Sequence, residues 1–269
     1  MSAKITFIGA GNMASSLAGG LIAKGYDPLQ ITMSDVNEQA LQSCRSLLGV
    51  NTGRDNISAC KKAEVIILAV KPQVMETVIT PLKEVANERN ALIISIAAGI
   101  TIEKLKQWLG NDLPYVRCMP NTPALVETGA TGMYANENVS ERHRELTKSI
   151  LSAVGLALWV DSEDQIDAVT AVSGSGPAYY FLVMEAMVEA GKSLGLSEQV
   201  AKQLTLQTAL GSAQMAITSE DNPAELRRKV TSPGGTTEKA INIMEEKGLR
   251  DTFLEALKGA YDRSKELSG

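Results

Sequence analysis

The chain has 269 residues, 44% of them hydrophobic, and a formal net charge of -5, so it can bury a sizeable core in one large domain or two smaller ones. The mild acidity and the lack of a basic stripe argue against nucleic acid as a partner, and no apolar run reaches the ~20 residues that span a bilayer. With three scattered cysteines and no N-terminal signal pattern, we expect a cytoplasmic protein without a disulfide framework or a metal site.

The first part of the chain alternates short β-rich runs with helical patterns, which favours a parallel sheet covered by helices. Strands are expected at residues 5–8, 30–34, 65–70, 92–96 and 115–119, with a weaker one at 131–135. Helices are expected at residues 36–48, 74–85, 102–109 and 141–153. Several of the strands are continuous apolar runs, as expected when both faces of a parallel sheet are covered.

A glycine-rich segment follows the first expected strand and opens a helix: Gly9-Ala10-Gly11-Asn12-Met13-Ala14. Gly9 permits the tight turn, Gly11 lets the backbone approach a pyrophosphate, and Ala14 allows close helix–strand packing. The helix N-terminus supplies amide donors for the anion. Between a strand and an amphipathic helix, this pattern predicts a dinucleotide site rather than a merely structural turn.

The second expected strand ends in Ser34 and Asp35, about 20 residues beyond the glycines, where the ribose of the adenosine half is read. Asp35 favours a free 2′-hydroxyl and hence NADH, although an aspartate here also suits the cap of the following helix. No arginine follows directly, so a 2′-phosphate would have to be held by Ser34, by backbone amides or by Asn37. The preference between NADPH and NADH stays open.

Two further segments end strands at the edge that faces the ligand crevice of such a sheet. In Ala69-Val70-Lys71-Pro72, Pro72 suits the first position of a helix, and Lys71 is either a phosphate or ribose contact or an ordinary helix-start lysine. The small residues of Ser95-Ile96-Ala97-Ala98-Gly99 either let a nicotinamide ring approach the backbone or simply terminate the strand.

After Asp161 the β-rich runs disappear and helical periodicity takes over at residues 178–194, 197–218, 223–230, 237–247 and 249–267. We therefore predict an α/β protein with an N-terminal Rossmann-type dinucleotide-binding domain over residues 1–160. An all-helical C-terminal domain over residues 161–269 should follow it. Because aromatic residues make up only 4% of the chain, we expect this helical domain to complete its core by dimerisation.

One turn of the helical domain predicts an anion site: Ser232-Pro233-Gly234-Gly235-Thr236-Thr237. Backbone N–H groups exposed just before a helix suit a carboxylate or a phosphate, and the alternative is an ordinary interhelix turn with Ser/Thr capping. A second break at residues 172–177 contains Ser175, and an irregular segment at residues 119–124 contains Asn121.

Conventional acid–base residues are missing near these motifs. The single histidine, His143, lies in a polar helical pattern, and we find no metal-ligand spacing and no Ser/His/Asp set. This absence fits reduction of an imine, because a protonated C=N already carries the positive charge that hydride requires. Such an enzyme needs positioning, a carboxylate anchor and one hydroxyl near nitrogen.

Taken together, the chain resembles the pyrroline-5-carboxylate reductases. The resemblance rests on segments that occur in this order: Phe7-Ile8-Gly9-Ala10-Gly11-Asn12-Met13-Ala14, Ala69-Val70-Lys71-Pro72, Met119-Pro120-Asn121-Thr122-Pro123-Ala124, Ser173-Gly174-Ser175-Gly176-Pro177-Ala178-Tyr179 and Ser232-Pro233-Gly234-Gly235-Thr236-Thr237. It implies reduction of 1-pyrroline-5-carboxylate to L-proline with NADPH or NADH. It also implies a helical domain that interlocks with its partner's in a homodimer, and such dimers commonly form decamers.

The resemblance also implies roles for single residues. Cofactor contacts would come from Ile8, Gly9, Ala10, Gly11, Asn12, Met13, Ser34, Asn56, Ala69, Val70, Lys71 and Ala97. The substrate carboxylate would rest on Ser232, Gly235 and Thr236, and the Thr237 hydroxyl would face the ring nitrogen as hydrogen-bonding partner or proton donor. Asp35 departs from what an enzyme that reads a 2′-phosphate prefers, which puts strict NADPH dependence in doubt.

Two other functions remain open from the residues alone. A β-hydroxyacid dehydrogenase shares this domain plan but relies on a lysine of the helical domain, and Lys192 and Lys202 lie outside any glycine-flanked motif. A non-catalytic dinucleotide sensor would keep the turn at Gly9 but would have no reason to retain a second anion site at Gly234.

Overall fold

The computed structural model describes residues 3–268. By its internal contacts the chain divides into two compact units. One comprises Met1–Ser175 together with Ala260–Gly269, and the other comprises Gly176–Gly259. This boundary lies after the change of texture at Asp161, because the short helical segments that follow Asp161 stay packed on the sheet.

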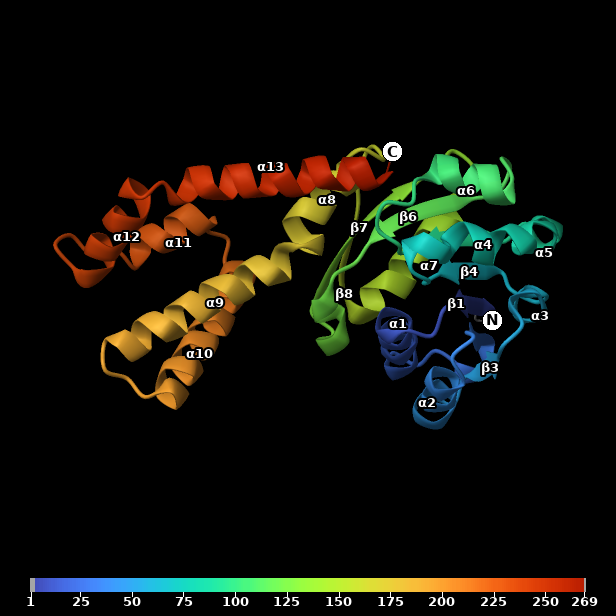
Figure 1. Cartoon of the computed structure of the whole chain (residues 1–269), viewed down its shortest axis with the longest axis horizontal. Coiled ribbons are helices and arrows are strands. Elements are labelled where there is room, and N and C mark those ends of the chain that lie inside the picture. The colour runs from blue at the N-terminus through green and yellow to red at the C-terminus, as the bar shows by residue number, and fades with distance from the viewer. Residues whose placement is uncertain (1–2, 269) are drawn as a thin grey trace. The chain divides into compact units, whose positions relative to one another are not determined.

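The first unit is built on an eight-stranded sheet of order β3-β2-β1-β4-β5-β6-β7-β8 (Figure 1). The strands are β1 (Ile5–Ile8), β2 (Ile31–Ser34), β3 (Asn51–Gly53), β4 (Val65–Leu68), β5 (Leu92–Ser95), β6 (Tyr115–Met119), β7 (Gly129–Ala135) and β8 (Gly155–Trp159). Strands β1 to β6 are parallel, β7 is antiparallel to β6, and β8 is parallel to β7. The order of the first six strands is that of a Rossmann fold, which confirms the predicted fold class.

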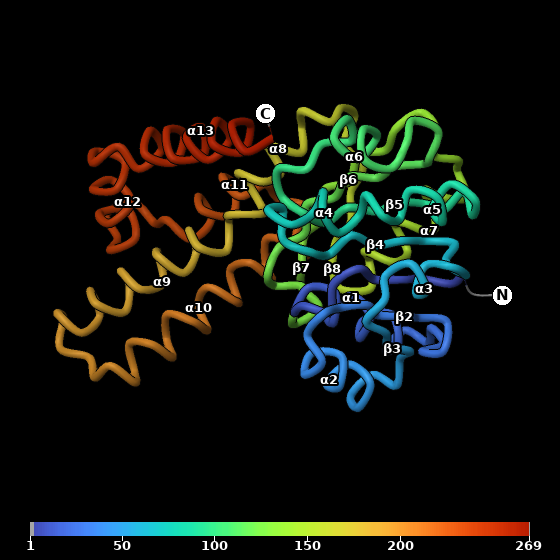
Figure 2. Tube along the Cα trace, turned by 45° about the vertical axis from the view of Figure 1, so that its right-hand side comes forward, coloured from blue at the N-terminus to red at the C-terminus, as the bar shows by residue number. Residues whose placement is uncertain are grey.

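Helices cover both faces of this sheet (Figure 2). One face packs against α1 (Asn12–Ala23), α2 (Glu38–Leu48) and α7 (Glu141–Leu151), and the other against α3 (Asn56–Cys60), α4 (Met75–Ile79), α5 (Lys83–Arg89) and α6 (Ile102–Leu109). A last short helix, α8 (Gln165–Val169), precedes the second unit. Because successive side chains of a strand point to opposite faces, Phe7 belongs to the first core and Ile8 to the second.

The sequence misjudged some elements of this unit. The helix expected at residues 74–85 is broken into 3-10 turns and the short helices α4 and α5. Pro81, in the 3-10 turn Thr80–Leu82, cannot donate a helical hydrogen bond and so separates them. Strands β3 and β8, at the two edges of the sheet, were not predicted, because β3 is only three residues long and the apolar run Gly155–Trp159 of β8 was overlooked.

The second unit is entirely helical. It contains α9 (Gly176–Ser193), α10 (Glu198–Thr218), α11 (Pro223–Lys229), α12 (Thr236–Glu246) and most of α13 (Leu249–Ser268), whose end belongs to the first unit. Each expected helix is found to within two residues. Large apolar side chains remain exposed on α9 and α10, among them Phe181, Leu182, Leu204 and Leu210.

No helix among residues 3–268 is both long and apolar enough to cross a membrane.

Candidate active site

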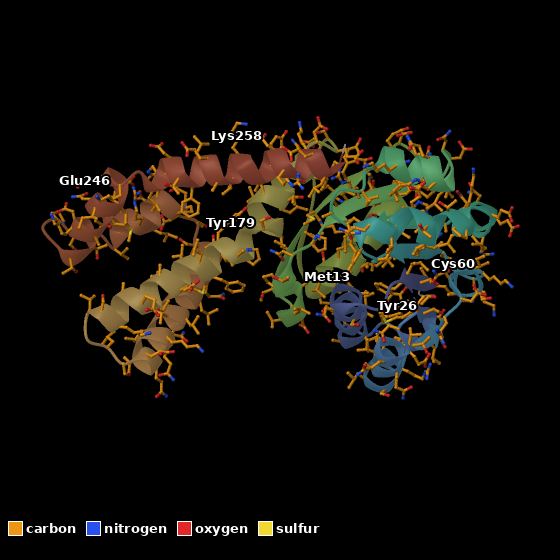
Figure 3. The ribbon with its side chains drawn as sticks, in the orientation of Figure 1. Met13, Tyr26, Cys60, Tyr179, Glu246 and Lys258 are labelled. Atoms are coloured by element: carbon orange, nitrogen blue, oxygen red, sulfur yellow. The ribbon has the colours of Figure 1, made fainter. Side chains whose placement is uncertain are left out.

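The predicted glycine turn opens α1 at the carboxyl end of β1. Gly9 has a φ of 106°, and a Cβ at this position would lie 2.7 Å from the carbonyl oxygen of Ala69, so only glycine fits. Gly11 is the extended N-cap residue of α1, and no side chain caps the helix. Among the described residues, the amides of Asn12 and Met13 have no acceptor. Figure 3 shows Met13 at this end of α1. The turn therefore offers free donors and the helix dipole to an anion.

Asp35 holds this turn instead of standing free. Its Oδ2 accepts the Ala10 N–H at 2.8 Å, and its Oδ1 accepts the Asn37 N–H at 2.8 Å. The cap of α2 is Asn37, whose side chain accepts the Ala40 N–H. Each carboxylate oxygen of Asp35 thus accepts one backbone amide, so Asp35 supports the glycine turn and does not cap α2, and a ribose contact by its remaining lone pairs stays a prediction.

A polar pair lies beside it at the end of β2. The Ser34 hydroxyl donates to Asn56 Oδ1 at 2.6 Å, which joins β2 to the first residue of α3. Ser34 is in register with Gly53, the last residue of β3, and the Asp35 N–H donates to the Gly53 carbonyl at 3.2 Å. The residue that follows β3, Arg54, therefore lies close to Asp35 at the sheet edge, although no arginine follows Asp35 directly along the chain. Sequence reasoning missed Arg54 because β3 was not predicted.

Arg54 is exposed and has no ion pair among the described residues. It lines a cavity of about 650 Å³ beside β2, β3 and α3. The cavity is also lined by Lys4, Lys61 and Lys62, and by one carboxylate, Asp55, which already accepts the Ile57 N–H and the Ser58 hydroxyl. Positive charge therefore predominates in the lining of this cavity.

The ends of β4 and β5 lie along the same edge of the sheet. The Ala69 N–H donates to the Ile8 carbonyl at 2.8 Å, and the Ile96 N–H donates to the Leu68 carbonyl at 3.2 Å. Lys71 is exposed and precedes a 3-10 turn in which Pro72 takes the first position, as predicted. The structure therefore brings the predicted cofactor residues Gly9, Ala69, Val70, Lys71 and Ala97 to one edge.

The second predicted turn opens α12 in the helical unit. Gly234 has a φ of 71°, and Gly235 is an extended N-cap residue without a side-chain cap. Thr236 and Thr237 form the start of α12 and are exposed. The Gly235 N–H donates to the Ser232 carbonyl at 3.0 Å, which closes the turn. The structure thus brings Ser232, Gly234, Gly235, Thr236 and Thr237 together around a free helix N-terminus.

Glu238 belongs to this turn and was missed. Its Oε2 accepts the Gly234 N–H at 2.8 Å. The signal was present in the sequence: a glutamate at the third helical position commonly reaches back to the amides that precede a helix. The carboxylate of Glu238 fixes Gly234 and leaves the amides of Thr236 and Thr237 free.

The remaining predicted substrate residues, Asn121 and Ser175, lie in the first unit. Asn121 Oδ1 accepts the Ala130 N–H at 2.8 Å and its Nδ2 donates to the Ser173 carbonyl at 3.0 Å. The Ser175 N–H donates to the Thr170 carbonyl at 2.8 Å. Asn121 therefore holds two segments of chain together, and a substrate contact by either residue stays a prediction.

Other reactive side chains have no catalytic setting. Burial, and secondarily Arg142, lowers the pKa of His143 on α7. Burial raises the pKa of the Cys60 thiol to about 12, and the pKa of Cys118 is also raised by burial. Over residues 3–268 no group of His, Cys, Asp and Glu side chains is arranged to hold a metal ion.

Comparison with known proteins gives matches over the whole chain. Residues 163–267 match the family model described as pyrroline-5-carboxylate reductase dimerisation, and residues 4–99 match that of the NADP oxidoreductases described as coenzyme F420-dependent. The chain is 53% identical to a pyrroline-5-carboxylate reductase from Pseudomonas aeruginosa over 98% of its own length and 97% of the relative's.

Solved structures agree with this result. A pyrroline-5-carboxylate reductase from Coxiella burnetii superposes with a TM-score of 0.97 at 48% identity over the full length of both chains. A pyrroline carboxylate reductase from Plasmodium falciparum with NADP bound superposes with a TM-score of 0.88 at 29% identity, over 100% of this chain and 99% of the other.

Proposed function

This chain belongs to the pyrroline-5-carboxylate reductase family, and on that premise we propose that it reduces 1-pyrroline-5-carboxylate to L-proline with NAD(P)H, the last step of proline biosynthesis. The observation that carries the proposal is the pair of uncapped glycine turns, at Gly11 and Gly235. One turn is suited to a pyrophosphate and the other to the carboxylate of a small acid.

The residues at the first turn fit a dinucleotide. Gly9 makes the tight turn against the Ala69 backbone, the space beside Gly11 is open, and Asn12 and Met13 have free amides for the pyrophosphate. Ser34 and Asn56 would hold the adenosine ribose, and Lys71 and Ala97 would line the remainder of the cofactor. When bound, the reduced nicotinamide supplies the hydride that adds to the carbon of the C=N bond.

NADPH is the preferred cofactor in this proposal. Asp35 has its two oxygens on the Ala10 and Asn37 amides, so its charge is partly neutralised and held toward the glycine turn. Arg54, which follows β3 beside it, is exposed and has no ion pair among the described residues, so it can pair with a 2′-phosphate. NADH has no 2′-phosphate and would not form that ion pair.

The second turn binds the substrate. Ser232, Gly234, Gly235 and Thr236 hold the carboxylate with hydroxyls and helix-start amides. The Thr237 hydroxyl accepts a hydrogen bond from the protonated ring nitrogen and so fixes the face of the ring. Protonation of the imine by solvent makes its carbon electrophilic, so no histidine or metal is needed for the proton.

The two domains predicted from the sequence divide these tasks in this proposal: residues 1–160 bind the cofactor, and residues 161–269 bind the substrate and form the dimer. The apolar side chains exposed on α9 and α10, such as Phe181 and Leu210, support a homodimer through the helical unit. Further assembly to a decamer and a cytoplasmic location complete the proposal.

The test is the oxidation of NADPH and of NADH by purified protein with pyrroline-5-carboxylate, followed by the loss of nicotinamide absorbance and by proline formation. Substrate-dependent oxidation, faster with NADPH, is the expected result. Absence of turnover with either cofactor, with cofactor still bound, would instead favour a dinucleotide sensor.

The Arg54→Ala variant isolates the cofactor preference. Loss of one exposed charge-assisted contact should raise the KM for NADPH by about five- to tenfold and leave the KM for NADH unchanged. Equal effects on both cofactors would remove Arg54 from 2′-phosphate recognition.

A further inference from the structure

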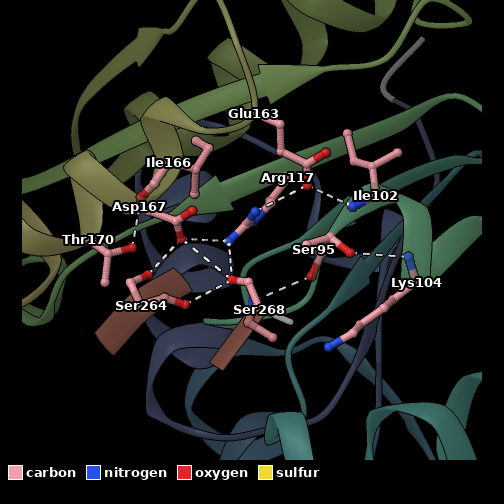
Figure 4. A network of polar contacts seen from close by, with 12 residues as sticks. Ser95, Ile102, Lys104, Arg117, Glu163, Ile166, Asp167, Thr170, Ser264 and Ser268 are labelled. Atoms are coloured by element: carbon pink, nitrogen blue, oxygen red, sulfur yellow. Dashed lines mark hydrogen bonds and ion pairs between the residues drawn. The ribbon is translucent and has the colours of Figure 1, made fainter. Parts of the chain in front are cut away.

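A buried polar cluster lies in the first unit, outside the cofactor turn and the substrate turn (Figure 4). Its centre is Arg117 of β6, whose side chain is only 3% exposed. The guanidinium donates through Nη1 to Glu163 Oε1 at 3.1 Å and through Nη2 to Asp167 Oδ1 at 3.3 Å. Removing either carboxylate would leave the buried charge of the guanidinium poorly compensated and would destabilise the fold.

Glu163 connects the cluster to the start of α6. The same Oε1 atom that pairs with Arg117 accepts the N–H of Ile102, the first residue of α6, at 2.8 Å. The Thr101 side chain accepts the Lys104 N–H one turn further along. Glu163, which follows β8, is therefore a remote cap on α6, and it fixes the far end of the loop at residues 96–101.

The last turn of α13 supports the middle of the same loop. A Cβ on Gly99 would lie 2.9 Å from the carbonyl oxygen of Leu267, so the backbone of α13 packs directly on that glycine. The Ser264 hydroxyl donates to Asp167 Oδ1 at 2.7 Å, and Ser268 Oγ accepts from Arg117 Nη2 at 3.2 Å. The cluster thus fastens the end of α13 against the loop.

The near end of this loop is part of the cofactor edge. Ile96 donates to the carbonyl of Leu68 at the end of β4, and Ala97, which follows, is 7% exposed. The loop is therefore fixed at one end by the sheet, in the middle by α13 and at the other end by Glu163. These three supports leave the backbone of the loop little freedom.

We propose that Glu163, paired with Arg117, and the last turn of α13 are positioning elements that hold the loop at residues 96–101 in place under the nicotinamide half of the cofactor. The inference rests on the proposed function for the identity of that ligand. The last turn of α13, which is far from the glycine motif in sequence, then takes part in aligning the cofactor. None of these residues needs to touch the cofactor.

The test compares Glu163→Ala, Glu163→Gln and Glu137→Ala in the full-length enzyme. Glu163→Ala removes the acceptor of the Ile102 N–H, so the KM for NADPH should rise and kcat should fall, each by about five- to tenfold, with the KM for the imine acid within about twofold. Glu163→Gln retains an oxygen for that N–H and should recover most of the loss. Glu137 also contacts α6, through an ion pair with Lys106 at 3.0 Å, but its side chain is exposed. Glu137→Ala should therefore leave kcat and both KM values unchanged.

Two further measurements keep the outcome decisive. If Glu163→Ala does not fold, Ser268→Ala, which removes a contact to Arg117 at 3.2 Å, must raise the KM for NADPH in the same direction. Fluorescence titration measures NADPH affinity without turnover. An inactive wild-type enzyme would therefore refute the proposed function, while titration of the variants would still test this inference. The inference would be overturned if the folded Glu163→Ala variant bound NADPH and turned over like the wild type. It would also be overturned if the KM for the imine acid rose as much as the KM for NADPH.

Discussion

The two glycine turns, one in each unit, share a local plan. Gly11 of α1 and Gly235 of α12 are both extended N-cap residues without a side-chain cap. Elsewhere among the described residues, α-helices that begin at an extended N-cap residue, such as Asn37 and Ser140, receive a hydrogen bond from that side chain. The uncapped starts are therefore the exceptions, and they coincide with the proposed anion sites.

A carboxylate fixes each turn at the same place. The residue before the N-cap donates its N–H to Asp35 Oδ2 in the first turn, from Ala10, and to Glu238 Oε2 in the second, from Gly234, both at 2.8 Å. In both turns the carboxylate uses the amide before the helix and leaves the first helical amides to a ligand.

The turns differ in what holds them. Asp35 reaches Ala10 from another strand, and a Cβ on Gly9 would meet the Ala69 backbone at 2.7 Å. Glu238 is only four residues from Gly234, and nothing lies within 4 Å of where a Cβ on Gly234 would stand. The first turn is therefore fixed by tertiary structure and the second by local structure. We expect the second to respond less to substitution of its glycine, and more directly to loss of a side chain that touches substrate.

Gly9→Ala should give the largest effect. The positive φ costs about 1–2 kcal/mol for an L-residue, and the clash with Ala69 adds to it, so cofactor affinity should fall by about 100-fold or more and the melting temperature should drop. Gly25→Ala is the matched control, because Gly25 has a φ of 90° but no neighbour within 4 Å. Similar losses of cofactor affinity in the two variants would show that the close approach to Ala69 does not matter.

Thr237→Ala comes next and should act on turnover. Loss of one hydrogen bond at the reacting nitrogen should lower kcat by about 10- to 100-fold, with cofactor affinity by fluorescence titration unchanged. Thr237→Ser keeps the hydroxyl and should restore much of the rate. An unchanged kcat for the alanine variant would remove Thr237 from the mechanism.

Asp35→Ala should weaken cofactor binding by about tenfold, since it releases the Ala10 amide and one end of the turn. Isothermal titration with NADPH measures this directly. The control is Asp27→Ala, which removes a cap on the Leu29 N–H at a distant 3-10 turn. If the Asp35 variant binds NADPH more tightly, the repulsion of a 2′-phosphate by the carboxylate outweighs its support of the turn.

Glu238→Ala should give the smallest effect. Its contact is local and exposed, so the KM for the imine acid should rise by about two- to fivefold, with the KM for NADPH unchanged. Glu246→Ala, at the other end of α12, serves as control. An effect as large as that of Asp35→Ala would contradict the view that the second turn is held only by local structure.

Much of the fold could be predicted because periodicity is a local signal. The bounds of β1, β6 and α6 were predicted to the residue, and the helices of the second unit to within two residues. The failures have physical reasons. Strand β3 is only three residues long, and the apolar run of β8, Gly155–Trp159, was overlooked. Pro81 was overlooked as the break between α4 and α5.

The sequence by itself determined the two glycine turns, the Rossmann plan and the helical second unit, because glycine spacing and apolar periodicity are local signals. It also determined the family, through several motifs that occur in order along the chain. Tertiary structure alone decided what surrounds those turns. It turned Asp35 toward Ala10, placed Arg54 next to Asp35 across two strands, and brought Glu163 to the start of α6. These partners lie 19 to 61 residues apart in the chain, and only the pairing of strands and the packing of helices on the sheet bring them close together.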